Sequence, residues 1–426
     1  MDWGRNVTFS HAVNWQSRVK LRHILILGFL LRAAWALLVD VSPMSDGFVY
    51  DQLAQRIASG HGYSWPSGEV TAYWPVGTSA LYACVYLIFG HNLGVVAAVN
   101  VIMGTLLIAA TYSLVRTQFD RCIALLAAAL VAVWPTWIAF TTIISSELPS
   151  TLAFTAALAV AFSAKGPAWL RTVISTVLIV VSTYVRANLL PFVVLVPALI
   201  ALQKRSVKYL VAHGILAAAI AAVLIAPWAM RNERAFGERV AISTNFGVNL
   251  WIGNNPQAHG GYDDPPAIGV DLEPLNEVEE DKLYREHAIS FIRENPGRYV
   301  ALTLSRVVQT FDRETYGVGW NQNGLAERAT LPLKAIMAGY WLAIFAAALA
   351  GLALYLWQNP ARILTAFVLI PGALVAPSIL VMASERFHYG LAPFVAAFAA
   401  YAVVRLVPLV HRGQQSDQRG NGVRNG

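Results

Sequence analysis

Apolar runs close to 20 residues long recur along the whole chain, with polar segments between them. A run of this length can cross the hydrocarbon core of a bilayer as one helix. The runs predict ten transmembrane helices, at residues 23–39, 93–115, 122–142, 147–164, 170–186, 188–202, 208–229, 333–357, 363–382 and 388–408. The pattern indicates an all-α polytopic membrane protein. Residues 1–22 form its N-terminal segment, 23–412 its transmembrane domain and 413–426 a disordered tail.

Lysine and arginine in the short loops predict the orientation of these helices, because such residues favour the cytoplasmic side. Residues 76–89 are apolar but short, and we interpret them as a partial segment that does not cross. With that assignment the basic loop residues share one side with both chain ends: Arg116, Arg121, Lys165, Arg171, Lys204, Arg205, Arg362 and Arg405. Both ends are then cytoplasmic, and residues 40–92 and 230–332 form two large outer loops.

Two segments, Arg32 in the first apolar run and residues 45–60 after it, are too polar for bare hydrocarbon. Arg32 interrupts the first apolar run, so we expect it to face protein, water or lipid headgroups, because bare hydrocarbon costs arginine at least about 2.5 kcal/mol. Residues 45–60 carry Val49, Leu53 and Ile57 on one helical face. This segment is too short and too polar to span, which predicts an interfacial helix in the outer loop.

Composition agrees with a membrane protein and removes other classes. The chain is 57% hydrophobic and 13% charged, whereas soluble domains carry about 25% charged residues. The net charge of +7 follows from the orientation pattern, so we predict no nucleic-acid partner. Cys84 and Cys122 lack metal-like spacing.

Four charged residues at outer helix ends or in outer loops are the candidates for chemistry. Asp46 is a candidate general base, and a simple N-cap is its alternative role. Glu147 is a candidate second acid, and a favourable helix-dipole position is its alternative. Arg186 and Arg386 are candidates for a bidentate grip on a phosphate, although arginine at a membrane edge also snorkels and Glu385 is an alternative partner for either.

Uncharged polar residues of the outer side complete the candidate site. We assign Tyr73 to phosphate binding, and we assign substrate binding to Tyr50, Asn249, Asn254 and Tyr389. The run GVNLWIGNNPQAHGGY suits a sugar through its amides and indole, but asparagine and glycine also favour turns by themselves. His259, His287 and His388 are too scattered for a metal site, so no metal ligand is assigned, and a divalent metal stays an open alternative.

Several motifs together resemble the GT-C glycosyltransferases, above all the family 39, aminoarabinose-transferase and protein-mannosyltransferase-like group. They are SDGFVYDQLAQRIASGHGY, TAYWPVGTSALYACVYLIFG, SSELPS, YVRANLL, NLWIGNNPQAHGGY and ERFHYGLAPF. By this resemblance Asp46 matches the essential carboxylate of the first loop, Glu147 an acid at the start of a later span, and Arg386 a basic residue opening the last helix. The chain departs from the pattern at Gly47, where relatives often carry a second acid, and at Trp74, where they often carry Arg or Lys.

The resemblance implies a glycosyltransferase of the bacterial inner membrane, with its active site facing outward. The donor would be a polyprenyl-phosphate sugar, and the acceptor a glycan, a lipid or a protein. A transporter or flippase of lipid-linked sugars is the alternative from another class, and a non-catalytic assembly partner is a third. A transporter predicts internal repeats and polar residues at mid-membrane depth, and the sequence displays neither. The oligomeric state is left open.

Overall fold

The computed structural model describes residues 19–406, and this part of the chain is helical. Within the described range the only β pairing consists of two isolated bridges, Ser64 with Val70 and Gly261 with Ala383. The predicted all-α class is therefore confirmed. The predicted N-terminal segment lies mostly outside the described residues, and the predicted disordered tail lies entirely outside them.

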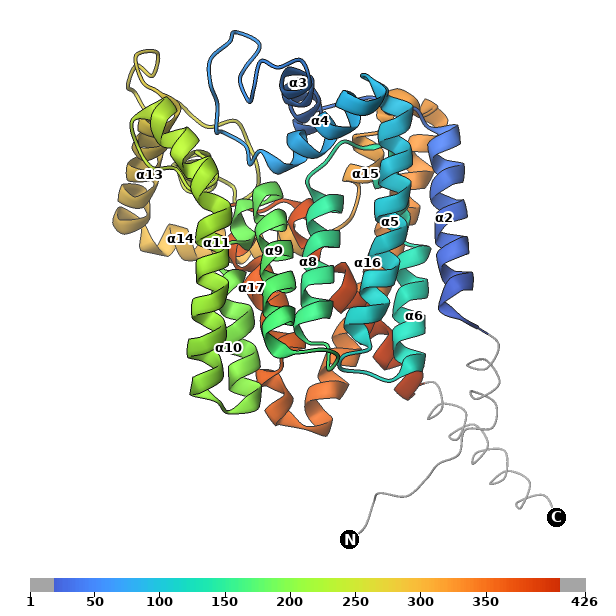
Figure 1. Ribbon diagram of the computed structural model, residues 1–426. Coiled ribbons are helices and arrows are strands. Elements are labelled where there is room, and N and C mark those ends of the chain that lie inside the picture. The colour runs from blue at the N-terminus through green and yellow to red at the C-terminus, as the bar shows by residue number, and fades with distance from the viewer. Residues whose placement is uncertain (1–18, 407–426) are drawn as a thin grey trace, which may run out of the picture.

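Long helices form a bundle, and shorter elements cover one of its ends (Figure 1). The bundle contains α2 (Leu21–Leu38), α5 (Leu93–Val115), α6 (Arg121–Ala132), α8 (Glu147–Ala161), α9 (Ala168–Val185), α10 (Phe192–Lys204), α11 (Val207–Phe236), α16 (Glu327–Gln358), α17 (Ala366–Leu380) and the final segment Glu385–Leu406. The connections α8–α9, α10–α11 and α16–α17 lie at one end, and α3 (Asp46–Ala58) and α4 (Gly77–Phe89) lie at the other. The basic loops therefore share one end of the bundle, as the predicted orientation requires.

The helices agree with the predicted spans. In the described residues seven helical segments are long and apolar enough to cross a membrane. Helix α6 with α7 (Pro135–Ala139) and η1 (Phe140–Thr142) makes an eighth if this pair, bent by 54°, is counted as one span. The shorter apolar helices α8 and α17 occupy the positions of the two remaining predicted crossings. Helix α4 has 13 residues, about 20 Å, and packs with α3 at the end of the bundle, in agreement with a partial segment.

The break between α6 and α7 explains how Arg32 is tolerated in the first span. Pro135 begins α7 and has no N–H, so the carbonyl of Val131 lacks its helical donor. The fully buried Arg32 supplies donors there, from Nη2 to Val131 O at 3.2 Å and from Nη1 to Ala132 O at 3.0 Å. Protein, water and lipid headgroups were the three environments expected for Arg32, and the structure surrounds it with protein.

The two long loops, residues 40–92 and 230–332, are fastened to each other at one end of the bundle. The second contains α12 (Phe246–Gly253), α13 (Glu277–Glu294), α14 (Pro296–Phe311), α15 (Tyr316–Gly319) and η3 (Gln322–Gly324). Glu277 accepts hydrogen bonds from Trp65 Nε1 at 3.0 Å, from the Ala72 N–H at 2.8 Å and from the Thr244 hydroxyl at 3.2 Å. These contacts fix residues 59–76, which lead from α3 to α4.

Candidate active site

Asp46 is the first residue of α3, and its carboxylate meets an arginine from the far end of the sequence. Arg386 Nη1 donates to Asp46 Oδ2 over 2.6 Å. The N-cap of α3 is Ser45 rather than Asp46, so the reading of Asp46 as a simple cap is wrong. Ser45 has φ 51° and ψ −131°, a backbone conformation that costs a non-glycine residue about 1–3 kcal/mol and that recurs at functional sites.

Gly47 explains one departure from the resembled motif. A Cβ at Gly47 would lie 2.7 Å from the carbonyl oxygen of Ile144, in the segment just before α8. The start of α3 therefore packs directly on that backbone and leaves no room for a second acid beside Asp46. This close approach also brings Asp46 toward the N-terminus of α8.

Glu147 is the first residue of α8, and both candidate arginines approach it. Its side chain is 1% exposed, and its Oε1 lies 2.8 Å from Arg186 Nη1 and 3.6 Å from Arg386 Nη1. The helix N-terminus does favour a carboxylate here. The two arginines show that Glu147 also joins a cluster of charges.

Asp46, Arg386, Glu147 and Arg186 thus form one connected row, which we call the four-charge cluster. Its two carboxylates and two guanidinium groups balance in charge. Side-chain exposure is 22% for Asp46, 16% for Arg386 and 21% for Arg186, so a ligand can reach all three. Aromatic rings hold the arginines in place: the Arg386 guanidinium carbon lies 5.1 Å from the centre of the Trp320 ring, and that of Arg186 lies 5.4 Å from the Phe387 ring.

These residues do not fit a metal ion. Among residues 19–406 no three His, Cys, Asp or Glu side chains gather closely enough to hold one. Arg386 Nη1 is within 3.6 Å of an oxygen of both Asp46 and Glu147. A cation placed between the two carboxylates would meet this guanidinium.

Glu385 holds the turn that carries Arg386 and does not pair with either candidate arginine, so that sequence alternative is wrong. Its Oε1 accepts from the backbone N–H groups of Thr315 and Tyr316, at 2.5 and 2.6 Å, at the start of α15. These contacts anchor η5 (Glu385–Leu391). Trp320, at the end of α15, then lies against Arg386. Neither contact has a local sequence signal, because 66 to 70 residues separate the partners.

A second anchor lies behind this turn, in the core of the bundle. His388 Nε2 is 3.0 Å from Glu314 Oε1, and both side chains are 1% exposed. Trp134 Nε1 donates to Glu314 Oε2 at 2.8 Å, and the His388 ring stacks on Trp341. These residues fix the base of η5, and within the described part of the chain they form no hydrogen bond or ion pair with the four-charge cluster.

Tyr50 and Tyr73 lie in an aromatic group beside the cluster. Trp74 contacts both rings edge-on, with centroid distances of 6.4 Å to Tyr50 and 4.5 Å to Tyr73. Burial, followed by the charges of Asp46 and Glu147, raises the pKa of Tyr50 above its ordinary value. Burial likewise raises the pKa of Tyr73. Both hydroxyls therefore stay protonated and remain donors.

The other three predicted substrate residues lie differently. Asn254 is fully buried, its Nδ2 donates to Leu250 O and Val381 O, and its Oδ1 accepts from Arg306. Its amide is therefore committed to the fold, which corrects the predicted substrate contact. Tyr389 is 1% exposed in the core, which corrects its assignment in the same way. Asn249 is partly buried on α12, and within residues 19–406 its side chain forms no hydrogen bond with the cluster.

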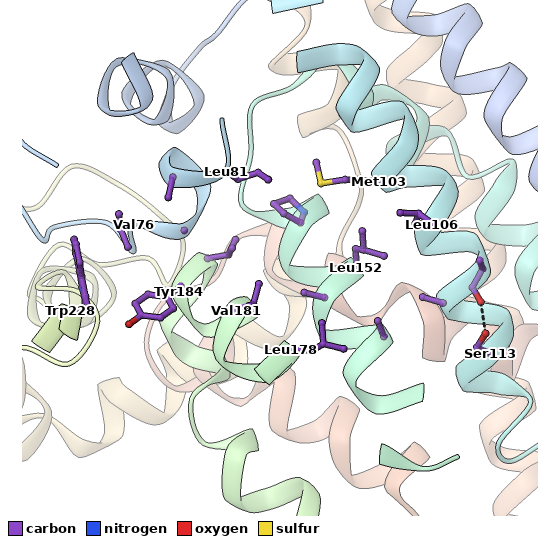
Figure 2. A pocket seen from close by; sticks show the side chains of 18 of the residues that line it. Val76, Leu81, Met103, Leu106, Ser113, Leu152, Leu178, Val181, Tyr184 and Trp228 are labelled. Atoms are coloured by element: carbon purple, nitrogen blue, oxygen red, sulfur yellow. Dashed lines mark hydrogen bonds between the residues drawn. The ribbon is translucent and has the colours of Figure 1, made fainter. Parts of the chain in front are cut away.

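An apolar groove lies between α4, α5, α8, α9 and α11 (Figure 2). Its volume is about 950 Å³, and its lining includes Pro149 and Val185, which are two residues and one residue from Glu147 and Arg186. The hydroxyls of Ser113 and Tyr184 donate to backbone carbonyls at 2.8 Å. An occupant therefore meets a hydrocarbon-like wall.

Comparison with known proteins confirms the resemblance. Residues 74–230, from just before α4 into α11, match the family model described as dolichyl-phosphate-mannose-protein mannosyltransferase. No curated protein matches the chain at a significant level. The fold of the chain is similar to that of the oligosaccharyltransferase AglB from Archaeoglobus fulgidus, solved with an inhibitory peptide and a dolichol-phosphate. The identity is 15% and the TM-score 0.54, over 95% of this chain and 52% of that chain.

Two further solved structures also match the chain. The apo form of the Archaeoglobus fulgidus oligosaccharyltransferase matches at 16% identity and a TM-score of 0.55, over 95% of this chain and 52% of that chain. ArnT from Cupriavidus metallidurans bound to undecaprenyl phosphate matches more weakly, at 13% identity and a TM-score of 0.42, over 92% of this chain and 78% of that chain. The chain spans about half the length of the oligosaccharyltransferases it matches. It has the GT-C fold, as its motifs predict.

Proposed function

We propose that the chain is a glycosyltransferase that moves a sugar from a polyprenyl-phosphate donor to an acceptor at the outer face of the bacterial inner membrane. The observation that carries the proposal is the four-charge cluster together with an apolar groove whose lining residues Pro149 and Val185 lie within two residues of Glu147 and Arg186. Such a pairing of charge and hydrocarbon wall matches a molecule with a phosphate at the end of a prenyl chain. The family name and the dolichol-phosphate held by the archaeal oligosaccharyltransferase support the same donor class.

The groove would hold the prenyl tail. Each CH₂ group moved from water to an apolar wall gains about 0.8 kcal/mol, although a tail that leaves lipid gains less. A lipid-side groove therefore selects for shape and guides the phosphate to Arg186, one residue beyond the lining residue Val185. It explains why the chemistry belongs at the membrane interface.

The arginines would grip the donor phosphate. Guanidinium groups bind phosphate in a bidentate manner, and such charge-assisted bonds are about twice as strong as neutral ones. Arg386 already donates to Asp46 at 2.6 Å. A phosphate would compete for this guanidinium and release the Asp46 carboxylate, so that donor binding would prepare the base.

The reaction would be a single displacement at the anomeric carbon. An acceptor hydroxyl or amine loses its proton to Asp46 while its O or N forms a bond to that carbon. The bond from the anomeric carbon to the phosphate oxygen breaks, and the polyprenyl phosphate leaves with the electron pair. Arg186 and Arg386 stabilise the charge that develops on the leaving phosphate, and Glu147 holds both arginines. The anomeric configuration is inverted.

The location of the cluster favours an enzyme over a carrier. Glu147 begins α8 and Arg186 follows the last residue of α9, so the charges stand at helix ends. An alternating-access carrier places its polar residues near the middle of the bilayer. The position of the cluster at the end opposite the basic loops supports an outward-facing site.

The test is transfer by the purified full-length protein in liposomes, with radiolabelled mannose on undecaprenyl phosphate as the first donor and other sugars on the same lipid as a panel. We expect labelled product from at least one lipid-linked donor and none from a nucleotide sugar. Ala153→Trp fills the groove from α8, whereas Ala343→Trp on the exposed face of α16 is its matched control. Loss of product in the first variant alone supports the groove assignment. Movement of donor across the bilayer without product would favour the flippase.

A further inference from the structure

A second cavity lies at the opposite end of the bundle from the four-charge cluster. It has a volume of about 240 Å³ and lies between the start of α6, the end of α16 and the end of the final segment. Gln118, Asp120, Tyr355, Arg362, Tyr401 and Arg405 are among its lining residues. Helix α5, which has 23 residues and a length of about 35 Å, connects the two ends. The cavity is therefore separate from the proposed active site.

Two arginines in this cavity are stacked on two tyrosines. The Arg362 guanidinium carbon lies 4.6 Å from the centre of the Tyr355 ring, and that of Arg405 lies 5.5 Å from the Tyr401 ring. A guanidinium group over a ring keeps its in-plane N–H groups available for an anion. Hydrogen bonds to their hydroxyls fix both rings. Gln118 Nε2 donates to the Tyr355 hydroxyl at 2.8 Å, and the Tyr401 hydroxyl donates to Gln358 Oε1 at 2.5 Å.

The charge of these arginines is not neutralised inside the described structure. Neither Arg362 nor Arg405 forms an ion pair with another residue of the range 19–406, and Arg362 makes one long bond, 3.4 Å, to the carbonyl of Tyr355. The acid that lines the cavity is Asp120. Its Oδ1 accepts from the N–H groups of Cys122 and Ile123 as the N-cap of α6, where the helix dipole offsets its charge. The cavity is therefore positive.

We propose that this cavity binds a phosphate-bearing anion between Arg362 and Arg405. In the orientation predicted from the basic loops, this end faces the cytoplasm, where the ligand is either the headgroup of an anionic phospholipid or free phosphate. The inference is independent of the proposed sugar transfer. The competing explanation is that the two arginines only maintain the orientation of the helices, as any basic residue at this end would.

Lys204 provides a matched control for that explanation. It lies at the same end of the bundle, at the C-terminus of α10, and its Nζ is 5.4 Å from the centre of the Tyr209 ring. It is a cation over a tyrosine that does not line the cavity. A general effect of basic residues would appear in Lys204→Ala as strongly as in the arginine variants.

The experiment titrates the purified full-length protein with short-chain phosphatidylglycerol, zwitterionic phosphatidylcholine and inorganic phosphate, with bound ligand counted by native mass spectrometry. Hydrogen bonds to charged groups predict that Arg362→Ala and Arg405→Ala each weaken anion binding about tenfold or more. Binding of phosphatidylglycerol without competition from phosphate identifies a lipid headgroup, and competition by phosphate identifies the free anion as a ligand.

The controls decide whether the cavity is responsible. Arg405 is exposed at the end of its helix, so Arg405→Ala should stay folded and keeps the test informative if the Arg362 variant unfolds. Lys204→Ala should bind like the unaltered protein. Equal binding of phosphatidylglycerol and phosphatidylcholine, with no competition by phosphate, overturns the proposal. An equal loss in Lys204→Ala overturns it as well.

Discussion

Two sets of arginines inside this molecule do different work. Arg186 and Arg386 face the carboxylates of Glu147 and Asp46, and their side chains are 21% and 16% exposed. Arg32 and Arg306 are completely buried. All four guanidinium groups are largely shielded from bulk water. Only Arg186 and Arg386 are exposed enough for a ligand to reach them.

The partners of the buried set explain the difference. Arg306, on α14, donates to Leu380 O at the end of α17 and to Asn254 Oδ1. Burial lowers the pKa of Arg306 to about 10, so it stays protonated at neutral pH. Arg32 fills the same role at the end of α6. Backbone carbonyls at helix ends cannot leave, whereas a carboxylate can exchange its arginine for a phosphate. The accessible pair is therefore suited to chemistry and the buried pair to structure.

The largest effect should come from the base. Asp46→Asn keeps the shape of the side chain but removes the proton acceptor, so we expect kcat for transfer to fall about 10²–10⁴-fold. Asp312→Asn is the control, because Asp312 pairs with Arg313 at 2.7 Å on the exposed surface. Steady-state transfer by both purified variants checks the prediction. Most of the activity surviving in Asp46→Asn would refute the catalytic role.

Replacing a buried arginine should lower the stability of the fold rather than the rate of transfer. Arg32→Met removes the donors of the Val131 and Ala132 carbonyls, and each orphaned carbonyl costs about 1–3 kcal/mol. Arg22→Met is the control on the same helix, at an exposed position. Thermal unfolding in detergent should show a lower midpoint for the Arg32 variant only. A normal midpoint together with lost transfer would place Arg32 among the functional residues and break the comparison.

Arg386→Ala tests the accessible set. Losing charge-assisted hydrogen bonds to the donor phosphate should raise the donor KM about 10–100-fold, with a much smaller change in the acceptor KM. Arg386→Lys keeps the charge without the planar fork and should recover part of the loss. Arg313→Ala is the exposed control. If donor and acceptor KM rise equally, Arg386 does not act on the phosphate.

Sequence reasoning predicted the features that local pattern controls. The apolar runs gave the spans, and the helical spacing of Val49, Leu53 and Ile57 predicted α3. Asp46, Glu147, Arg186 and Arg386 were recognisable as candidates because each lies at a helix end on the same side, and the structure brings them together.

The misses at Asn254, Glu385 and Trp320 depend on contacts between distant parts of the chain. Asn254 has the same local pattern as a sugar-binding amide, and only the presence of Arg306 shows that it is structural. Glu385 was considered as an arginine partner, whereas its carboxylate caps α15. Trp320 has no motif around it and becomes notable only beside Arg386. Such partners are set by tertiary packing, which periodicity cannot report.

Tyr50 should produce the smallest effect and sharpen the boundary of the site. Burial and the neighbouring charges of Asp46 and Glu147 raise its pKa, so its hydroxyl stays a donor through the pH range in which the protein works. Tyr50→Phe removes the hydroxyl that would donate one neutral hydrogen bond to the substrate, for which about 0.5–1.5 kcal/mol predicts a two- to tenfold fall in kcat/KM. Because the hydroxyl does not ionise, the fall of kcat/KM at alkaline pH should occur at the same pH in the variant and in the unaltered protein. A shift of this alkaline limb would mean that Tyr50 ionises during turnover and that it shares the role of base with Asp46. An unchanged kcat/KM would instead leave Tyr50 as packing for Trp74 and confine the site to the four charges.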